Sequence, residues 1–408
     1  MMDDNDNSRS IVRRMPMPGG ASTPLAPPLM TSVAYGAADP DALDAIYEGR
    51  APGYTYAREG HPNATMLAAR IDWLEGAEGG IVTSSGMSAV TAAVMALICE
   101  GDHVLGSSQL YGRSLRLLTR DLPRLGFATS LVDMTDLAAV EAALRPETRL
   151  MLVETISNPT LRVADIAGLA ALAQSRDILL AVDNTFATPR AYRPLDAGAD
   201  VVIHSVTKLL AGHSDVTLGY VAARSEEHRA SLRDTSETWG LTPSPFDCWL
   251  ADRGLHTFGV RYDQARANAA ELADHLSWCA GVKRVIYPGR ADHPDAARAA
   301  AMFGTNQGCM VCFEIDGGRP AANALVRAAV PIPFAPTLGD VATTLAHPAS
   351  SSHRGLNEKD LAKLGISEGF FRVSVGIEDI EMIKMELESA IEAAAASGDS
   401  AAGGRATG

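Results

Sequence analysis

Between about residue 60 and residue 225, short apolar runs alternate with segments of helical period, and this alternation constrains the fold most. The apolar runs cover residues 80–83, 103–106, 128–132, 149–154, 178–183, 200–204 and 218–222. Helical segments at 66–74, 87–99, 114–125, 137–144 and 164–174 lie between most of them. Strands that alternate with helices favour a largely parallel sheet with helices on both faces. We therefore predict an α/β fold for this part of the chain.

The chain changes character after Pro245. Residues 245–280 have the pattern of one or two long helices, and strand-like runs follow at 282–287, 310–315 and 371–375, before a terminal helix at 379–395. This pattern predicts a smaller α+β domain. The predicted divisions are a disordered start and extended arm at 1–60, a large domain at 61–255, a small domain at 256–395 and a disordered Ala/Gly/Ser-rich tail at 396–408.

Composition narrows the range of partners. The 408 residues carry a formal net charge of −14, which disfavours nucleic acids and anionic membranes. No apolar run approaches the ~20 residues of a membrane span, and the N-terminus lacks the apolar core of a secretory signal. Five scattered cysteines suit a reducing compartment. We expect a cytoplasmic protein with a small-molecule partner and no metal site.

Residues with useful chemistry gather where the predicted strands end, which is where ligands bind in open α/β sheets. Asp183 ends one apolar run, and Lys208 follows the next run after the hydroxyl residues Ser205 and Thr207. A carboxylate can keep a pyridine nitrogen protonated, an amine can form a Schiff base and hydroxyls can bind a phosphate. The set therefore meets the minimum needs of pyridoxal phosphate (PLP). Alone, such an aspartate could cap a turn and such a lysine could face solvent.

Other candidates have two explanations each. Ser85 and Gly86 precede an Ala-rich helix whose first amides suit a phosphate, and the alternative is a plain strand–helix turn with a serine cap. Tyr111 opens a helix, where it could stack on a planar ring or pack structurally. Arg372 lies in an apolar strand, where it could clamp a substrate α-carboxylate or form a structural salt bridge.

Taken together, these residues occur in an order that resembles the Cys/Met-metabolism family of PLP enzymes, which includes cystathionine γ-synthase, cystathionine γ- and β-lyase, methionine γ-lyase and O-acylhomoserine sulfhydrylases. The resemblance runs from roughly residue 25 to 395. The segments that carry it are Tyr56-Ala-Arg58, Ser85-Gly-Met87, Glu154-Thr-Ile-Ser-Asn-Pro-Thr160, Val182-Asp-Asn-Thr185, Ser205-Val-Thr-Lys208, Ser244-Pro-Phe-Asp247, Arg253-Gly-Leu255, His347-Pro-Ala-Ser350 and Arg372-Val-Ser-Val-Gly-Ile-Glu378. It implies an aminotransferase-like (fold type I) large domain with a mostly parallel seven-stranded sheet, and a PLP-dependent enzyme.

The resemblance implies a role for each matching residue. The catalytic set would be Lys208 as the Schiff-base lysine, Asp183 beside the pyridine nitrogen and Tyr111 stacked on the ring. Asn158 would bind near the cofactor's phenolic oxygen and the substrate carboxylate, which Arg372 would clamp. The remaining cofactor-binding residues would be Ser85, Gly86, Met87, Thr185, Ser205 and Thr207, and Thr337 would join the substrate-binding set.

The resemblance also implies an assembly. Tyr56 and Arg58 match the pair that, in the family, reaches the phosphate of the neighbouring subunit. The implied oligomer is a homotetramer of two active dimers, with the N-terminal arm crossing the dimer interface.

The sequence departs from the family pattern at several positions. Gly60-His-Pro-Asn63 replaces the usual Gly-Asn-Pro-Thr, and Thr337 stands where serine is common. Ala342 replaces a glutamate that can help to recognise the distal amino group of cystathionine. Arg113 stands where typical methionine γ-lyases carry a cysteine, and it could bind a substrate acyl or carboxylate group or face solvent.

These observations predict a carbon–sulfur lyase of transsulfuration and sulfur amino-acid metabolism, which would release a 2-oxo acid and ammonia. One alternative is γ-replacement on an O-acylhomoserine, as in cystathionine γ-synthases or O-acylhomoserine sulfhydrylases. A specialised γ-substitution with a non-sulfur nucleophile is another. A catalytically silent PLP-binding regulator is the alternative outside enzymes.

Overall fold

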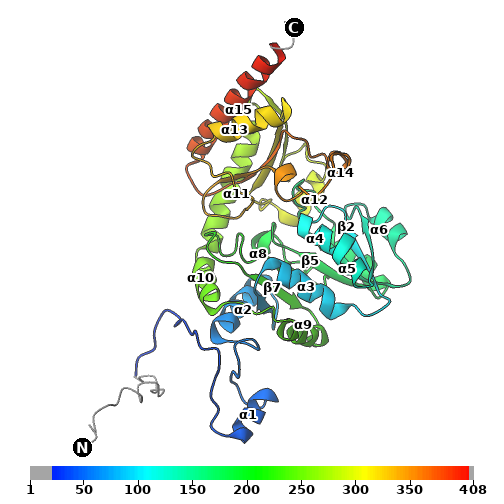
Figure 1. Ribbon diagram of the computed structural model, residues 1–408, viewed down its shortest axis with the longest axis vertical. Helices are drawn as coiled ribbons and strands as arrows, with labels where there is room; N and C mark the ends of the chain where they lie inside the picture. Colours follow the sequence, from blue (N-terminus) through cyan, green and yellow to red (C-terminus); the bar gives the residue numbers. More distant parts are fainter. Residues whose placement is uncertain (1–20, 404–408) are drawn as a thin grey trace, which may run out of the picture.

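The computed structural model describes residues 21–403, so residues 1–20 and 404–408 of the two predicted disordered ends lie outside the described residues. Two sheets organise the chain (Figure 1). The larger one has seven strands in the order β1-β7-β6-β5-β4-β2-β3. Their bounds are β1 (Ile81–Thr83), β2 (His103–Ser107), β3 (Ala128–Val132), β4 (Thr148–Glu154), β5 (Leu179–Asp183), β6 (Val201–His204) and β7 (Gly219–Ala223). Each predicted apolar run is therefore a strand.

The direction of the strands confirms the predicted fold class. Neighbours along β6-β5-β4-β2-β3 are all parallel, whereas β7 runs antiparallel to both β6 and β1. Alternate side chains of β4 and β5 point to opposite faces: Leu152 and Ala181 pack with α3 (Gly86–Leu97), and Val153 and Val182 pack with α7 (Ile166–Ser175). Burial on both faces explains why these strands are apolar throughout.

The other helices of the large domain are α2 (Pro62–Glu75), α4 (Gly112–Arg116), α5 (Leu122–Arg124), α6 (Leu137–Ala143), α8 (Thr188–Ala191) and α9 (Glu226–Thr238). The helix predicted at 114–125 is interrupted by a π-helical turn at Leu117–Asp121. Pro123 explains the interruption, because its ring nitrogen has no hydrogen to donate to an i−4 carbonyl.

Helix α10 (Pro245–Leu255) packs against α2 of the large domain. Helix α11 (Phe258–Leu276) leads into the small domain, which contains an antiparallel sheet of order β10-β11-β9-β8. The strands are β8 (Val282–Ile286), β9 (Met310–Ile315), β10 (Thr344–Ala346) and β11 (Phe370–Ser374), and the helices are α12 (Ala296–Phe303), α13 (Gly318–Ala328), α14 (Glu358–Lys363) and α15 (Ile380–Gly403). The last helix continues to Gly403, whereas the sequence predicts disorder from residue 396.

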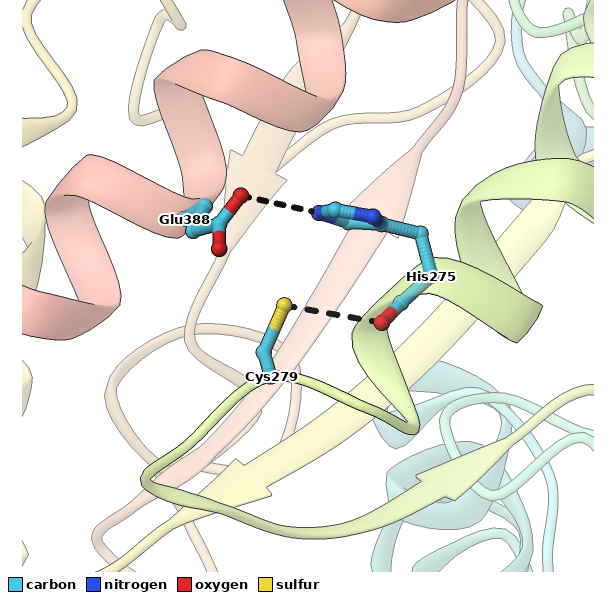
Figure 2. Close-up of side chains that lie close together, drawn as sticks. All are labelled: His275, Cys279 and Glu388. Carbon is cyan, nitrogen blue, oxygen red and sulfur yellow. Dashed lines mark hydrogen bonds and ion pairs between the residues drawn. The ribbon is translucent and has the colours of Figure 1, made fainter.

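A side-chain cluster of His275, Cys279 and Glu388 joins α11 to α15 in the small domain (Figure 2). His275 Nε2 lies 3.4 Å from a Glu388 carboxylate oxygen, and the thiol of Cys279 donates to the carbonyl of His275 at 3.5 Å. These three side chains are close enough to share a metal ion. However, burial and the carboxylates of Glu388 and Glu392 raise the pKa of Cys279, which keeps its thiol protonated and neutral. We assign the cluster a packing role.

The N-terminal arm leaves the body of the molecule, and its one short helix, α1 (Pro40–Tyr47), lies apart from the sheets (Figure 1). None of the residues of α1 is buried. Asn63 fixes the base of the arm by accepting from the N–H of Met30 at 3.0 Å and donating to the carbonyl of Pro28 at 3.1 Å. Among residues 21–403, no helix combines the length and the apolar character needed to cross a bilayer.

Candidate active site

The predicted Schiff-base lysine lies at the carboxyl edge of the large sheet. β6 ends at His204, and the next residues turn so that the N–H of Lys208 donates to the carbonyl of Ser205 at 3.1 Å. Lys208 Nζ donates to Thr337 Oγ1 at 3.2 Å. Burial lowers the pKa of Lys208, and the positive charge of Arg372 adds to this effect. A lowered pKa increases the share of neutral amine, which is the nucleophilic form.

Asp183 lies at the end of β5, next to the strand that leads to Lys208. Its Oδ1 accepts two bonds from Thr185, from the N–H at 3.0 Å and from the hydroxyl at 2.5 Å. Thr185 Oγ1 in turn accepts from the N–H of Ser205 at 2.8 Å. Burial raises the pKa of Asp183, and the bonds from Thr185 oppose that rise. The carboxylate is thus held at an edge where a protonated ring nitrogen would be a suitable partner.

The first turn of α3 and the turn after β6 form a place for an anion. Ser85 caps α3 by accepting from the N–H of Ser88 at 3.1 Å. A Cβ on Gly86 would lie 2.7 Å from Ser205 Cβ, so glycine is required for this close approach. Unpaired amides at a helix N-terminus bind phosphate well. The two remaining predicted phosphate-site residues lie nearby in the chain: Met87 accepts from Ser114 Oγ at 3.8 Å and Thr207 Oγ1 bonds to the backbone of Leu218.

Arg372, from β11, brings the small domain to the site. It is 4 % exposed, and it donates from Nη1 to Asn158 Oδ1 at 2.6 Å and from Nη2 to the carbonyl of Thr337 at 2.9 Å. Its Nε is buried without a hydrogen-bond partner, and its guanidinium carbon lies 5.7 Å from the ring centre of Phe186. A buried cation with a spare N–H group suits an anionic ligand such as a carboxylate.

Tyr111 is the N-cap of α4 and is 37 % exposed. Its N–H donates to Glu154 Oε1 at 2.6 Å, while Glu154 Oε2 accepts from the N–H of Asn158 at 2.9 Å. The structure therefore connects Tyr111, Asn158, Arg372, Thr337 and Lys208 by hydrogen bonds, with Glu154 as the link that the sequence analysis quoted without a role. Its place at the end of β4, in register with the end of β5, was the available signal.

Tyr56 and Arg58 lie elsewhere. Tyr56 is 44 % exposed, and Arg58 donates to the carbonyl of Glu237 at 3.2 Å and pairs with Glu59. Arg58 lines a pocket of about 320 Å³ between α2 and α9. Within the part of the chain that the structure describes, neither residue bonds to the first turn of α3 or to the turn that carries Lys208.

Comparison with known proteins shows which family has this arrangement of site residues. The sequence pattern of the family described as "Cys/Met metabolism PLP-dependent enzyme" matches residues 12–392. The chain belongs to this family. It is 40 % identical over 352 residues to an O-succinylhomoserine sulfhydrylase of Pseudomonas aeruginosa, covering 86 % of each chain, and 37 % identical over 378 residues to an L-methionine gamma-lyase of Pseudomonas putida, covering 92 % of this chain and 94 % of the relative.

A solved structure agrees with the sequence relatives. Cystathionine gamma synthase from Xanthomonas oryzae pv. oryzae, in complex with cystathionine, matches with a TM-score of 0.87 and 36 % identity, over 91 % of this chain and 94 % of that one. Family and structure together confirm the predicted fold and the predicted resemblance. The protein is a PLP-dependent enzyme.

The structure accounts for two of the departures from the Cys/Met-metabolism pattern. His61 is buried and takes over the N-cap of α2, because Nδ1 accepts from the N–H of Ala64 at 3.1 Å while Nε2 donates to the carbonyl of Pro243. Asn63 is the residue that binds the arm.

Ala342 brings only a methyl group to its position. The side chain of Arg113, two residues after Tyr111, is exposed and has no hydrogen-bond or ion-pair partner among residues 21–403.

Proposed function

We propose that this member of the family is a carbon–sulfur lyase, which breaks the C–S bond of a sulfur amino acid and releases a 2-oxo acid and ammonia. The observation that supports this most is the meeting of an amine and a guanidinium at Thr337. Lys208 Nζ donates to its hydroxyl at 3.2 Å, and Arg372 donates to its carbonyl at 2.9 Å. An α-amino acid whose carboxylate bound Arg372 would present its α-carbon near Lys208.

The residues of the site fit the cofactor, which, when bound, supplies an electron sink for the negative charge that develops at the substrate α-carbon. In this proposal Lys208 anchors the cofactor and then moves the α-proton, while Asp183 keeps the ring nitrogen protonated. Tyr111 stacks on the ring and assists the leaving sulfur by moving a proton. Asn158 and Arg372 orient the carboxylate. The phosphate belongs at the first turn of α3, with Ser85, Gly86, Met87, Ser205 and Thr207, and Thr185 supports the aspartate.

A second candidate is γ-replacement on an O-acylhomoserine, and Arg113 is the observation that favours it. An exposed guanidinium without a partner among the described residues, close to Tyr111 in the chain, would suit the free carboxylate of a succinyl group. Ala342 argues against a site dedicated to cystathionine, because it offers no carboxylate to a distal amino group.

A substrate panel tests these proposals. Cystathionine, cysteine, methionine, homocysteine and O-acylhomoserines are each supplied with and without a thiol, and 2-oxo acid, ammonia and thioether are measured. We expect 2-oxo acid and ammonia from a sulfur amino acid without added thiol. Thioether formed only from an O-acylhomoserine and a thiol would favour replacement. PLP binding without any turnover would contradict both and favour a regulator.

We further propose that the active unit is a dimer within a homotetramer, in which Tyr56 and Arg58 reach the phosphate of the neighbouring subunit. The exposure of both side chains supports this, as does an arm with exposed apolar side chains such as Leu25 and Val33. We place the enzyme in the cytoplasm, in keeping with its five free cysteines.

A further inference from the structure

Glu154 is a buried acid in the site that the proposed catalytic steps do not use. It is the last residue of β4 and is 8 % exposed. Both of its carboxylate oxygens are occupied: Oε1 accepts from the N–H of Tyr111 at 2.6 Å and Oε2 from the N–H of Asn158 at 2.9 Å. One side chain therefore satisfies two backbone donors that come from different loops.

These two donors belong to residues with different proposed roles in the site. Tyr111 begins α4 and carries the ring assigned to stacking, whereas Asn158 accepts from Arg372 Nη1 at 2.6 Å and so belongs to the carboxylate clamp. The continuous chain of bonds is Tyr111–Glu154–Asn158–Arg372. Because one carboxylate is a small rigid group, it fixes the separation between the tyrosine and the clamp.

We propose that Glu154 is a positioning residue for the reaction, which holds Tyr111 at a fixed place relative to the clamp formed by Asn158 and Arg372. This inference rests on the roles given to those residues in the proposed function. Its importance follows from geometry, since a misplacement of about 1 Å at a reacting centre can cost on the order of 100-fold in rate.

A substitution of Glu154 can change the position of Tyr111 without removing the support of the cofactor by Asp183. Glu154 pairs in register with Asp183 on the neighbouring strand. Burial raises the pKa of Glu154 well above its usual value, and the negative charge of Asp183 raises it further, while the two N–H bonds and the positive charge of Arg372 oppose the rise. A neutral glutamine at position 154 adds no repulsion to Asp183, and the bonds that Asp183 accepts from Thr185 do not involve Glu154.

Glu154→Gln is the first test, because glutamine keeps one accepting oxygen and replaces the other with an NH₂ group that faces an N–H donor. Glu314→Gln is the matched control. Glu314 is also a buried strand residue, 7 % exposed, and its two oxygens accept from Ser367 Oγ at 2.6 Å and from Arg284 Nε at 2.5 Å, within the small domain. Both variants replace a buried carboxyl group whose two oxygens accept hydrogen bonds, and only Glu154 bonds to site residues.

We expect Glu154→Gln to lower kcat/KM by about 10- to 100-fold while PLP affinity stays within about threefold of wild type. In the cofactor-free protein, hydrogen–deuterium exchange should become faster in the peptides that contain Tyr111 and Asn158, and Glu314→Gln should change neither peptide. Unchanged exchange in both peptides, or kcat/KM within about twofold of wild type, would overturn the inference.

Glu154→Asp keeps the test decisive if the glutamine variant does not fold. Aspartate retains the charge but is one methylene shorter, so it cannot reach both N–H groups at once, and the same gain in exchange and loss of kcat/KM are expected. An enzyme with no turnover of any substrate in the panel would refute the proposed function, whereas the exchange measurement would still decide the role of Glu154.

Discussion

At the scale of single residues, burial shifts the pKa values of the two central ionisable groups in opposite directions. Burial lowers the pKa of Lys208 and raises the pKa of Asp183. Both residues could be predicted from the sequence, because each follows the end of an apolar run that predicts a strand. It could not give Glu154 a role, because its partners Tyr111 and Asn158 come together only in the folded chain.

Arg372→Lys tests the carboxylate clamp. Arg372 uses two nitrogens at once, for Asn158 and Thr337, and lysine offers a single point charge instead of a planar fork. We expect kcat/KM to fall by about 100-fold, mainly through KM, with PLP affinity little changed. Steady-state kinetics together with PLP titration measure this. A loss of PLP binding with an unchanged KM would instead place Arg372 at the cofactor.

His353 gives a prediction for stability. It is 1 % exposed, and burial, with a further effect from the positive charge of Arg372, lowers its pKa to about 4. Below the ordinary histidine pKa of about 6.5 the unfolded chain takes up a proton that the folded chain refuses, so stability is present above that pH and is lost as pH falls towards 4, by up to roughly 3 kcal/mol.

Denaturant unfolding of the wild type and of His353→Gln, at several pH values between 7.5 and 4.5, measures this. The free energy of unfolding should fall less steeply with decreasing pH in the variant, because its buried amide does not titrate. The other histidines are present in both proteins, so their contributions to the pH dependence of the free energy of unfolding cancel in the comparison. Parallel pH curves would show that His353 contributes nothing to acid sensitivity.

At the scale of elements, apolar runs predicted all seven strands of the large sheet because these strands are buried on both faces. The short strand β10 was not predicted, since three residues are too few to show a period. Helix α9 was also missed, because charged and polar residues fill most of its length and only Leu232 and Ser236 are buried. Helices α1, α8, α12, α13 and α14 were not predicted either.

Gly112→Ala tests how the start of α4 is packed. A Cβ at Gly112 would lie 1.9 Å from the carbonyl oxygen of Ser352, whereas a Cβ at Gly259, in α11, would meet nothing within 4 Å. We expect Gly112→Ala to destabilise the protein by about 1–3 kcal/mol and to reduce activity by displacing Tyr111. Gly259→Ala, the matched control, should be neutral or stabilise by up to about 1 kcal/mol. Equal effects of the two substitutions on Tm would refute this packing argument.

At the scale of the whole molecule, the proposed assembly gives the arm and the pair Tyr56 and Arg58 a role at a second chain. Periodicity carries no information about contacts between subunits, so only the resemblance to the family predicted this pair. In the structure, Arg58 bonds to α9 of its own chain and lines a pocket there. If the site is shared between subunits, mixing two inactive variants can restore activity, which a site within one chain does not allow.

Mixing two inactive proteins tests the shared site. In the proposal, Lys208→Ala removes the anchor and Arg58→Ala removes the phosphate contact, each from the chain that carries it. If subunits exchange and the sites are shared, a hybrid dimer contains one doubly altered site and one intact site, and a 1:1 mixture should recover about a quarter of wild-type activity. No recovery, after exchange has been verified by mass spectrometry, would place Arg58 at the site of its own chain.

The most direct test of the account is to locate the covalent bond between the protein and pyridoxal phosphate. The chain has five lysines, and Lys283, Lys359, Lys363 and Lys384 all lie in the small domain, away from the edge that holds Asp183. Protein loaded with PLP is reduced with borohydride, digested and mapped by mass spectrometry. A pyridoxyl group on Lys208, absent in Lys208→Ala, is the expected result. A pyridoxyl group on any other lysine, or on none, would contradict the account.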